Sequence, residues 1–362
     1  MFTTMTKLDF TLPPELEANA PAEARGLSRD GVRLLVSYAR NHQIHHTHFY
    51  DLPRFLQAGD VLVINTSGTL NAAIPATRAD GTEMKIHLST HLPGDLWAVE
   101  VRQMVEGAAA ASGSPSANGL TKPFFDAIAH ETYALPGGAS LLLHTPYNGS
   151  KRLWLASLRL EKPDDLISYL NRHGTPIRYY YVPESWPLNY YQTVYVTEPG
   201  SAEMPSAGRA FTPELITRLV AQGVQIAPLL LHTGVASLED NEKPYEEYYR
   251  VSGETARLVN AARSSGRRII AVGTTAVRAL ETVTDENAYT YGGTGYTNLF
   301  LTPERGVRAV NGLLTGLHEP CATHLMMLEA ICGREHLHHT YAAALQERYL
   351  WHEFGDLHLI LP

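Results

Sequence analysis

Cysteine is scarce in this sequence: only Cys321 and Cys332 occur among its 362 residues. Two thiols are too few for a disulfide framework or for a zinc site with four cysteine ligands. Long apolar runs are missing as well, since none approaches the roughly 20 residues of a membrane-spanning helix. The first residues, MFTTMTKLDFTLPPEL, lack the basic segment and following apolar segment of an export signal. These absences predict a cytoplasmic protein that does not contact membranes.

Basic side chains are also few. The chain has 29 Lys and Arg against 37 Asp and Glu, which leaves a formal net charge of −8. This balance argues against a broad nucleic-acid-binding surface, because phosphate binding depends on clustered cations. Two short basic segments, at residues 151–152 and 263–268, leave room for a local basic patch, although solvated loops or helix ends explain them more simply.

The hydrophobic pattern indicates helices and strands in alternation over much of the chain. Residues 212–223 and 252–266 begin with Thr212 and Ser252, which are typical N-cap residues, and each helical pattern leads into an apolar strand. Such alternation is typical of an α/β domain. We therefore expect a mostly parallel sheet with flanking helices.

A different pattern interrupts this alternation. From residue 74 to residue 160 the sequence consists of short alternating runs separated by turns, which predicts an antiparallel β-barrel-like domain. The α/β domain would then be discontinuous, formed by residues 1–73 and 161–362, with the barrel-like domain of residues 74–160 inserted into it.

Three predicted strands end on polar or glycine residues. These ends are Asn65, His232 with Gly234, and Gly273. Ligands of α/β proteins bind beyond the carboxyl ends of the strands. If the three strands are parallel neighbours, these residues share one edge of the sheet and form a binding site.

The segment IIAVGTTAVRALET, residues 269–282, has the pattern of a strand, a tight turn and a helix N-terminus. It lacks the lysine and the glycine spacing of a phosphate-binding P-loop. The positive end of a helix at Gly273, Thr274 and Thr275 favours a carboxylate, and a simple threonine N-cap is the alternative.

Histidine and glycine residues near these strand ends are further candidates. His232 can act as an acid or a base, or it is a buried histidine bonded to the backbone. Gly208 allows a close approach of the backbone to a ligand, or makes a turn. The histidine-rich segments HQIHHTHFYD and EHLHHTY offer no third ligand of suitable geometry, so we predict no metal site.

Several segments occur together in an order that resembles a known family. They are DLPRFLQAGDVLVIN, YYQTVYVTEPGSAEMPSAGRAFTPELITRL, LLLHTG, VGTTAVRALE, TGLHEP and ERYLWHEFGDLHLIL. In this order they are similar to the S-adenosylmethionine:tRNA ribosyltransferase-isomerases of queuosine biosynthesis, over nearly the whole chain. The resemblance implies an α/β domain with an inserted β-barrel.

The resemblance also implies a reaction. The family transfers and isomerises the ribosyl group of S-adenosylmethionine onto 7-aminomethyl-7-deazaguanine in tRNA, forms an epoxycyclopentanediol, and releases adenine and methionine. No cofactor beyond the co-substrate S-adenosylmethionine is implied. The expected catalytic residues are His232, Arg278, Glu281 and His318. The expected substrate-binding residues are Asn65, Ser206, Gly208, Arg209, Gly234, Glu247, Gly273, Thr274 and Thr275.

Three departures from the family pattern bear on the acceptor. The family's N-D-T-R is NTSG here, from Asn65 to Gly68, its A-P-T-A-G-L-H-F-T is MPSAGRAFT with Arg209 and Ala210, and its H-S-E is YEE, ending at Glu247. An aspartate, an arginine and an imidazole are thus missing. These changes favour a divergent paralog, and they leave tRNA, a small-molecule nucleophile, or a catalytically inactive binding role open. The sequence does not predict the oligomeric state.

Overall fold

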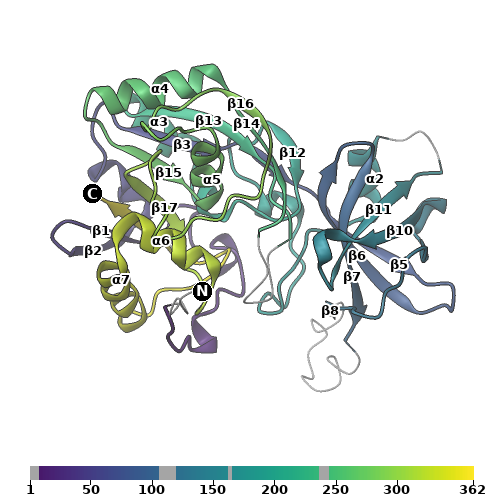
Figure 1. The fold of residues 1–362 in the computed structure, drawn as a ribbon. Coiled ribbons are helices and arrows are strands. Elements are labelled where there is room, and N and C mark those ends of the chain that lie inside the picture. The colour runs from purple at the N-terminus through teal and green to yellow at the C-terminus, as the bar shows by residue number, and fades with distance from the viewer. Residues whose placement is uncertain (1–7, 106–119, 162–164, 236–243) are drawn as a thin grey trace.

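The computed structural model describes residues 8–105, 120–161, 165–235 and 244–362. These residues form a large α/β body and a β-barrel that lie side by side (Figure 1). The α/β body contains a nine-stranded sheet in the order β16-β14-β13-β3-β15-β17-β18-β1-β2. Its strands are β1 (Arg33–Tyr38), β2 (Gln43–His48), β3 (Val61–Asn65), β13 (Gln225–Leu231), β14 (Glu247–Val251), β15 (Ile269–Val272), β16 (Gly293–Thr297), β17 (Gly312–Gly316) and β18 (Leu357–Leu361).

The large sheet is mixed, so the prediction of a mostly parallel sheet was wrong. Strands β13, β3, β15 and β17 are parallel neighbours, as are β18 and β1. The pairs β13–β14, β14–β16, β17–β18 and β1–β2 are antiparallel. Two consecutive helices between β17 and β18 return the chain in the opposite direction, whereas a single crossover helix gives a parallel neighbour.

Helices cover both faces of this sheet. Helices α4 (Gly253–Ser264), α5 (Thr274–Thr282), α6 (Thr323–Cys332) and α7 (Arg334–Gln346) contribute to one apolar core, and α3 (Pro213–Ala221) contributes to the other. The predicted caps are present: Thr212 accepts a hydrogen bond from Leu215 N, and Ser252 from Thr255 N. Each cap satisfies a backbone donor that has no partner within the helix.

The β-barrel confirms the predicted antiparallel part of the fold. It is formed by β5 (Ala73–Thr77), β6 (Glu83–Leu92), β7 (Leu96–Met104), β9 (Thr132–Ala134), β10 (Ser140–Pro146) and β11 (Leu153–Arg159), with β8 (Thr121–Pro123) beside β7. Pairing of β11 with β7 closes the six strands into a barrel. Helix α2 (Leu166–His173) packs Tyr169 and Leu170 into the barrel core. The domain boundaries at residues 73 and 160 stay a prediction.

Two short segments of the α/β body adjoin its large sheet. Strand β4 (Ser67–Thr69) follows β3 directly and pairs in parallel with β12 (Glu198–Ser201). The 3-10 helix η8 (Ser206–Gly208) follows β12 and precedes α3. Strand β4 continues from the carboxyl end of β3, and η8 contacts β17.

Candidate active site

The side chain of Asn65 ties together the carboxyl ends of β3 and β13 and the start of α5. Its Nδ2 donates to the carbonyl oxygen of Leu231 at 2.8 Å and to Thr275 Oγ1 at 3.2 Å. Its Oδ1 accepts from the backbone N–H groups of Leu231 at 2.9 Å and Ser67 at 3.1 Å. Asn65 is buried, so these bonds replace water entirely. Residues that follow three different strands are therefore held at one edge of the sheet.

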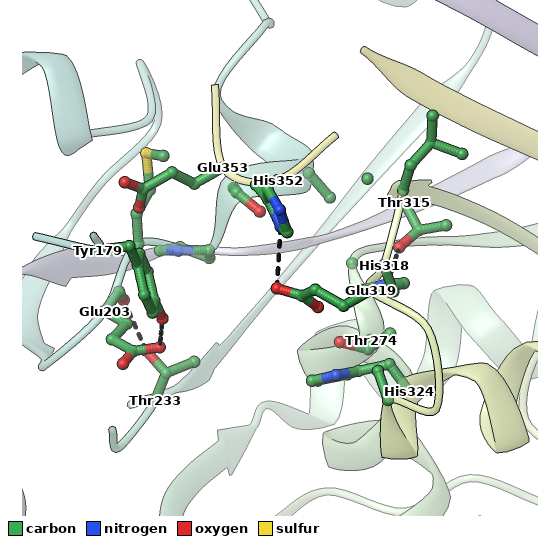
Figure 2. A pocket seen from close by; sticks show the side chains of 18 of the residues that line it. Tyr179, Glu203, Thr233, Thr274, Thr315, His318, Glu319, His324, His352 and Glu353 are labelled. Atoms are coloured by element: carbon green, nitrogen blue, oxygen red, sulfur yellow. Dashed lines mark hydrogen bonds and ion pairs between the residues drawn. The ribbon is translucent and has the colours of Figure 1, made fainter. Parts of the chain in front are cut away.

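A cavity of about 460 Å³ opens at this edge. Figure 2 shows Tyr179 and Glu203 on one side of it and Thr274, His318 and His324 on the other. Five of the predicted site residues line the cavity: Ser206, Gly273, Thr274, Thr275 and His318. Its other lining residues include Tyr179, Tyr180, Tyr181, Glu203, Thr233, Thr315, Glu319, Thr323, His324, His352 and Glu353.

The N-terminus of α5 forms one wall of the cavity. Its N-cap residue Gly273 has φ 89° and ψ 154°, a backbone conformation that side chains disfavour. Gly273 N–H donates to the carbonyl oxygen of Leu314 at 2.8 Å, and no side chain caps the helix. The first backbone N–H groups of a helix have no partner within it and carry partial positive charge. This wall therefore favours an anionic group.

The opposite wall is aromatic and acidic. The rings of Tyr179 and Tyr181 are stacked with centroids 5.4 Å apart, and the Tyr179 hydroxyl donates to the carboxylate of Glu203. Burial raises the pKa of Glu353 well above its ordinary value, and the negative charge of Glu203 adds to this shift. No motif of the sequence predicted this wall, although the three consecutive tyrosines at residues 179–181 are an unusual run that marks it.

His318 lies on the same side of the cavity as Thr274 and His324 (Figure 2). Its Nε2 is 3.0 Å from Thr315 Oγ1, and its ring is stacked on that of His324 with centroids 4.6 Å apart. Burial, and then the neighbouring His324, lower the pKa of His318 to about 3. The imidazole is therefore neutral at physiological pH and has a nitrogen that can accept a proton.

His352 joins the cavity rim to the N-terminal segment. Its Nδ1 is 2.9 Å from Glu319 Oε1, its Nε2 is 3.3 Å from Glu17 Oε1, and its ring is stacked on Tyr181 with centroids 4.1 Å apart. Burial raises the pKa of the Glu319 carboxyl, but the hydrogen bond and charge of His352 outweigh this effect and lower the pKa to about 2. The Glu319 side chain is still 53% exposed, because it faces the open cavity.

Comparison with known proteins identifies the family. Residues 5–360 match the family described as queuosine biosynthesis protein. The chain belongs to this family. It is 35% identical to the S-adenosylmethionine:tRNA ribosyltransferase-isomerase of Moorella thermoacetica, over 98% of this chain and 99% of that protein. The protein of the same name from Desulfitobacterium hafniense is 34% identical over 98% of both chains.

A solved structure is similar over the same length. The crystal structure of S-adenosylmethionine tRNA ribosyltransferase from Thermotoga maritima is 28% identical to this chain, with a TM-score of 0.53. The match covers 98% of this chain and 100% of that one. The expected membership of the queuosine biosynthesis family is thus confirmed.

The other residues expected from the family pattern lie outside the cavity wall. His232 Nδ1 is 2.7 Å from Ser67 Oγ, and its Nε2 is 3.8 Å from Glu198 Oε1. Burial lowers the pKa of His232, partly offset by Glu198. Ser67 Oγ is also 2.6 Å from Ser201 Oγ, which accepts from Thr233 N–H at 3.0 Å. Since Thr233 lines the cavity, this network links His232 to the cavity through Ser67, Ser201 and Thr233.

Arg278, Glu247 and Gly234 form a second group outside the wall. The Arg278 guanidinium pairs with the Glu247 carboxylate, not with Glu281 one turn along its own helix. Glu247 also accepts from Gly234 N–H at 2.8 Å, and Arg278 donates to the carbonyl oxygen of Leu299 at 3.1 Å. This group fastens α5 to the loop after β13 and to β14.

Glu281 is a buried residue of α5, and its side chain holds the segment before β17. Its carboxylate pairs with Arg305 at 2.7 Å and accepts from the backbone N–H groups of Arg308 at 2.6 Å and Ala309 at 2.5 Å. Its oxygens are thus already bonded to protein groups. The catalytic roles of His232, Arg278, Glu281 and His318 stay predictions.

The structure also locates the departures from the family pattern. A Cβ atom on Gly68 would lie 2.5 Å from Val196 Cγ2, so any larger side chain at this position would require Val196 to move. Arg209 pairs with Glu23 at 2.7 Å and donates to the carbonyl oxygen of Tyr190 at 2.8 Å, and Ala210 is buried in the core. The close backbone approach expected at Gly208 is made by protein, since a Cβ there would lie 1.9 Å from the Tyr195 hydroxyl.

Within the part of the chain that the structure describes, no group of three or more His, Cys, Asp or Glu has a geometry suited to a metal ion. None of the described helices combines the length and apolar character needed to cross a membrane.

The Glu319–His352 pair predicts a pH dependence of stability. Because the pKa of Glu319 is about 2 in the folded protein against an ordinary 4.5, its ionised form stabilises the fold above pH 4.5, and this contribution is lost as the pH falls towards 2. We expect Glu319→Gln to lower the free energy of unfolding near neutral pH by at most about 1 kcal/mol, given the exposure of the pair. Urea unfolding should show this difference shrink at acidic pH. The exposed Glu304, changed to Gln, is the control, and a pH-independent difference would contradict the assignment.

Proposed function

We propose that this protein is an S-adenosylmethionine:tRNA ribosyltransferase-isomerase. It transfers and isomerises the ribosyl group of S-adenosylmethionine onto 7-aminomethyl-7-deazaguanine in tRNA, and it releases adenine and methionine. Relatives with this name are 35% and 34% identical to the chain over 98% of its length, which supports this activity.

The observation that carries the proposal is the chemical division of the cavity. The positive end of α5 at Gly273–Thr275 suits the carboxylate of S-adenosylmethionine. The carboxylates of Glu203 and Glu319 suit its sulfonium and ammonium charges, and the tyrosines at residues 179–181 suit stacking of its adenine. The volume of about 460 Å³ lies in the range of small-molecule sites.

The chemistry needs a base and no redox step. The sulfonium acidifies the neighbouring ribose carbon, and His318 takes the proton from it. Adenine leaves as the sugar ring opens, and the acceptor amine attacks. The carbon next to the sulfonium then adds to the aldehyde to close the carbocycle, and the alkoxide formed displaces the sulfur, which closes the epoxide and releases methionine. With a pKa of about 3 the imidazole of His318 is unprotonated at physiological pH, so it has a free nitrogen for the proton, and the negative charge of Glu319 favours the imidazolium that forms.

The residues outside the wall support this arrangement. Arg278 and Glu281 anchor α5 on two sides, so they fix the position of the helix end that binds the carboxylate. Asn65 holds Thr275 at the same helix end. His232 acts through Ser67, Ser201 and Thr233 at the edge of the cavity.

A second candidate differs in the acceptor. The net charge of −8 and the residues Gly68 and Ala210, where the family has arginine and histidine, favour a small-molecule nucleophile in place of tRNA. S-adenosylmethionine would bind in the same cavity in either case.

Turnover tests the reaction. We expect the protein, incubated with S-adenosylmethionine and tRNA carrying 7-aminomethyl-7-deazaguanine, to release adenine and methionine, as measured by mass spectrometry. His318→Ala should lower the rate by ~10²–10⁴, the usual effect of losing an acid–base group. His338→Ala, an exposed histidine on α7, is the control. Binding of S-adenosylmethionine without product from any acceptor would favour an inactive binding protein.

The carboxylate position is tested with decarboxylated S-adenosylmethionine. A charge-assisted hydrogen bond contributes about 1.5–3 kcal/mol, so we expect the decarboxylated compound to bind roughly 10- to 100-fold more weakly in calorimetry. Equal affinity of the two compounds would show that α5 does not bind the carboxylate.

The acceptor is tested by binding of tRNA at low and at physiological salt. An enzyme that contacts several phosphates should lose affinity steeply as salt increases. Tight, salt-sensitive binding of a tRNA with wobble guanosine, together with formation of the modified base, supports tRNA as the acceptor. Weak binding of tRNA at both salt concentrations favours a small-molecule acceptor. The chain would then have too few Lys and Arg side chains at the tRNA phosphates to displace their counterions.

A further inference from the structure

A hydrogen-bonded chain of histidines and one serine runs from the surface into the α/β body. His42, in the turn between β1 and β2, is exposed, and its Nδ1 is 3.1 Å from Nδ1 of His336 on α7. His336 Nε2 is 2.9 Å from Ser37 Oγ, which is 2.8 Å from Nε2 of His358 on β18. His336 is 1% exposed, and Ser37 and His358 are 0% exposed.

The inner end of this chain lies beside the cavity wall. His358 is paired directly with Thr315 across the antiparallel strands β18 and β17. Side chains at such positions point to the same face, with Cβ atoms about 4.5–5.5 Å apart. Thr315 is the residue whose hydroxyl bonds to His318 Nε2, and both line the cavity. The hydrogen-bonded chain thus ends one cross-strand neighbour away from Thr315, which bonds to His318, the proposed base.

The free nitrogen of His358 points to a role beyond packing. Its Nδ1 is buried and has no hydrogen-bond partner among the described residues. Leaving such a nitrogen unpaired is costly, and the surrounding core of Leu35, Leu313 and Ile360 would accept an apolar side chain more easily. A partner for Nδ1 on the side of Thr315 would complete an unbroken path to the cavity.

The groups of the chain have the properties that proton transfer needs. Burial, followed by neighbouring imidazoles, lowers the pKa of His336 to about 4 and that of His358 to about 3. Both rings are therefore neutral at physiological pH, and a neutral imidazole has one N–H donor and one acceptor nitrogen. The hydroxyl of Ser37 likewise donates and accepts.

We propose that His358, Ser37, His336 and His42 relay protons between the cavity and the solvent beside α7. The proposal rests on the proposed function, in which His318 takes a proton from the ribose carbon next to the sulfonium. That C–H bond breaks and an N–H bond forms at His318 Nδ1. The proton on His318 Nε2 passes through the Thr315 hydroxyl, or one water molecule, to His358 Nδ1.

The same exchange repeats along the chain. His358 releases its Nε2 proton to Ser37, and Ser37 passes one on to His336 Nε2. His336 releases its Nδ1 proton to His42 Nδ1, and His42 gives its Nε2 proton to water. One proton leaves the cavity and one enters the solvent, so no charge stays in the buried chain.

The experiment measures adenine release by His42→Ala at saturating S-adenosylmethionine and tRNA. Since His42 is exposed, the variant should fold as the wild type does. We expect kcat to fall about tenfold with KM unchanged, less than the ~10²–10⁴ for a direct acid–base group, because water still reaches the cavity. Free imidazole in the buffer should restore kcat, because it replaces the missing ring at the surface.

Three further variants separate the relay from a structural effect. His48→Ala removes another exposed histidine, stacked on Tyr50, and should change neither kcat nor the response to imidazole. Ser37→Ala should lower kcat without rescue, because imidazole cannot reach the buried gap, while Ser37→Thr should retain activity through its hydroxyl. Wild-type kcat in His42→Ala, or a loss that imidazole does not restore, would overturn the relay alone. A wild-type protein that releases no adenine would instead overturn the proposed function, and the relay with it.

Discussion

The site depends on the four hydrogen bonds of one buried amide, that of Asn65. With them Asn65 satisfies the backbone at the end of β13, the turn into β4 and the Thr275 hydroxyl at the start of α5. Burying a polar group without such a partner costs free energy, so each of these three segments is stabilised by the positions of the other two. Arg278 and Glu281 extend the same constraint along α5. The helix end at the cavity is therefore held rigidly from both sides.

This rigidity gives the cavity a stable electrostatic division. A helix end of positive potential and the neutral imidazole of His318 lie opposite a wall that carries Tyr179 and the carboxylate of Glu203, and the carboxylate of Glu319 lines the same cavity. S-adenosylmethionine carries a carboxylate at one end and positive charge at its sulfur, so the polarity of the cavity matches that of the molecule. Fixed charges in a partly dehydrated site act more strongly than the same charges in water.

The departures from the family pattern are absorbed by local packing. Gly68 fits beneath Val196 where a longer side chain would collide, and Arg209 is neutralised by Glu23 of the N-terminal segment. Neither residue lines the cavity described above. The changes therefore affect the surroundings of the site, and the cavity suited to S-adenosylmethionine is retained.

The sequence by itself determined the helix caps at Thr212 and Ser252, the antiparallel barrel, the strand end at Asn65 and the helix start at Gly273. These features follow from local periodicity and turn chemistry, which act between near neighbours in the chain. Tertiary structure decided the mixed sheet, the pairing of Arg278 with Glu247 across 31 residues, and the tyrosine wall opposite α5. Such contacts join distant segments, and no local pattern specifies which of several possible partners a buried charge or an apolar strand will meet.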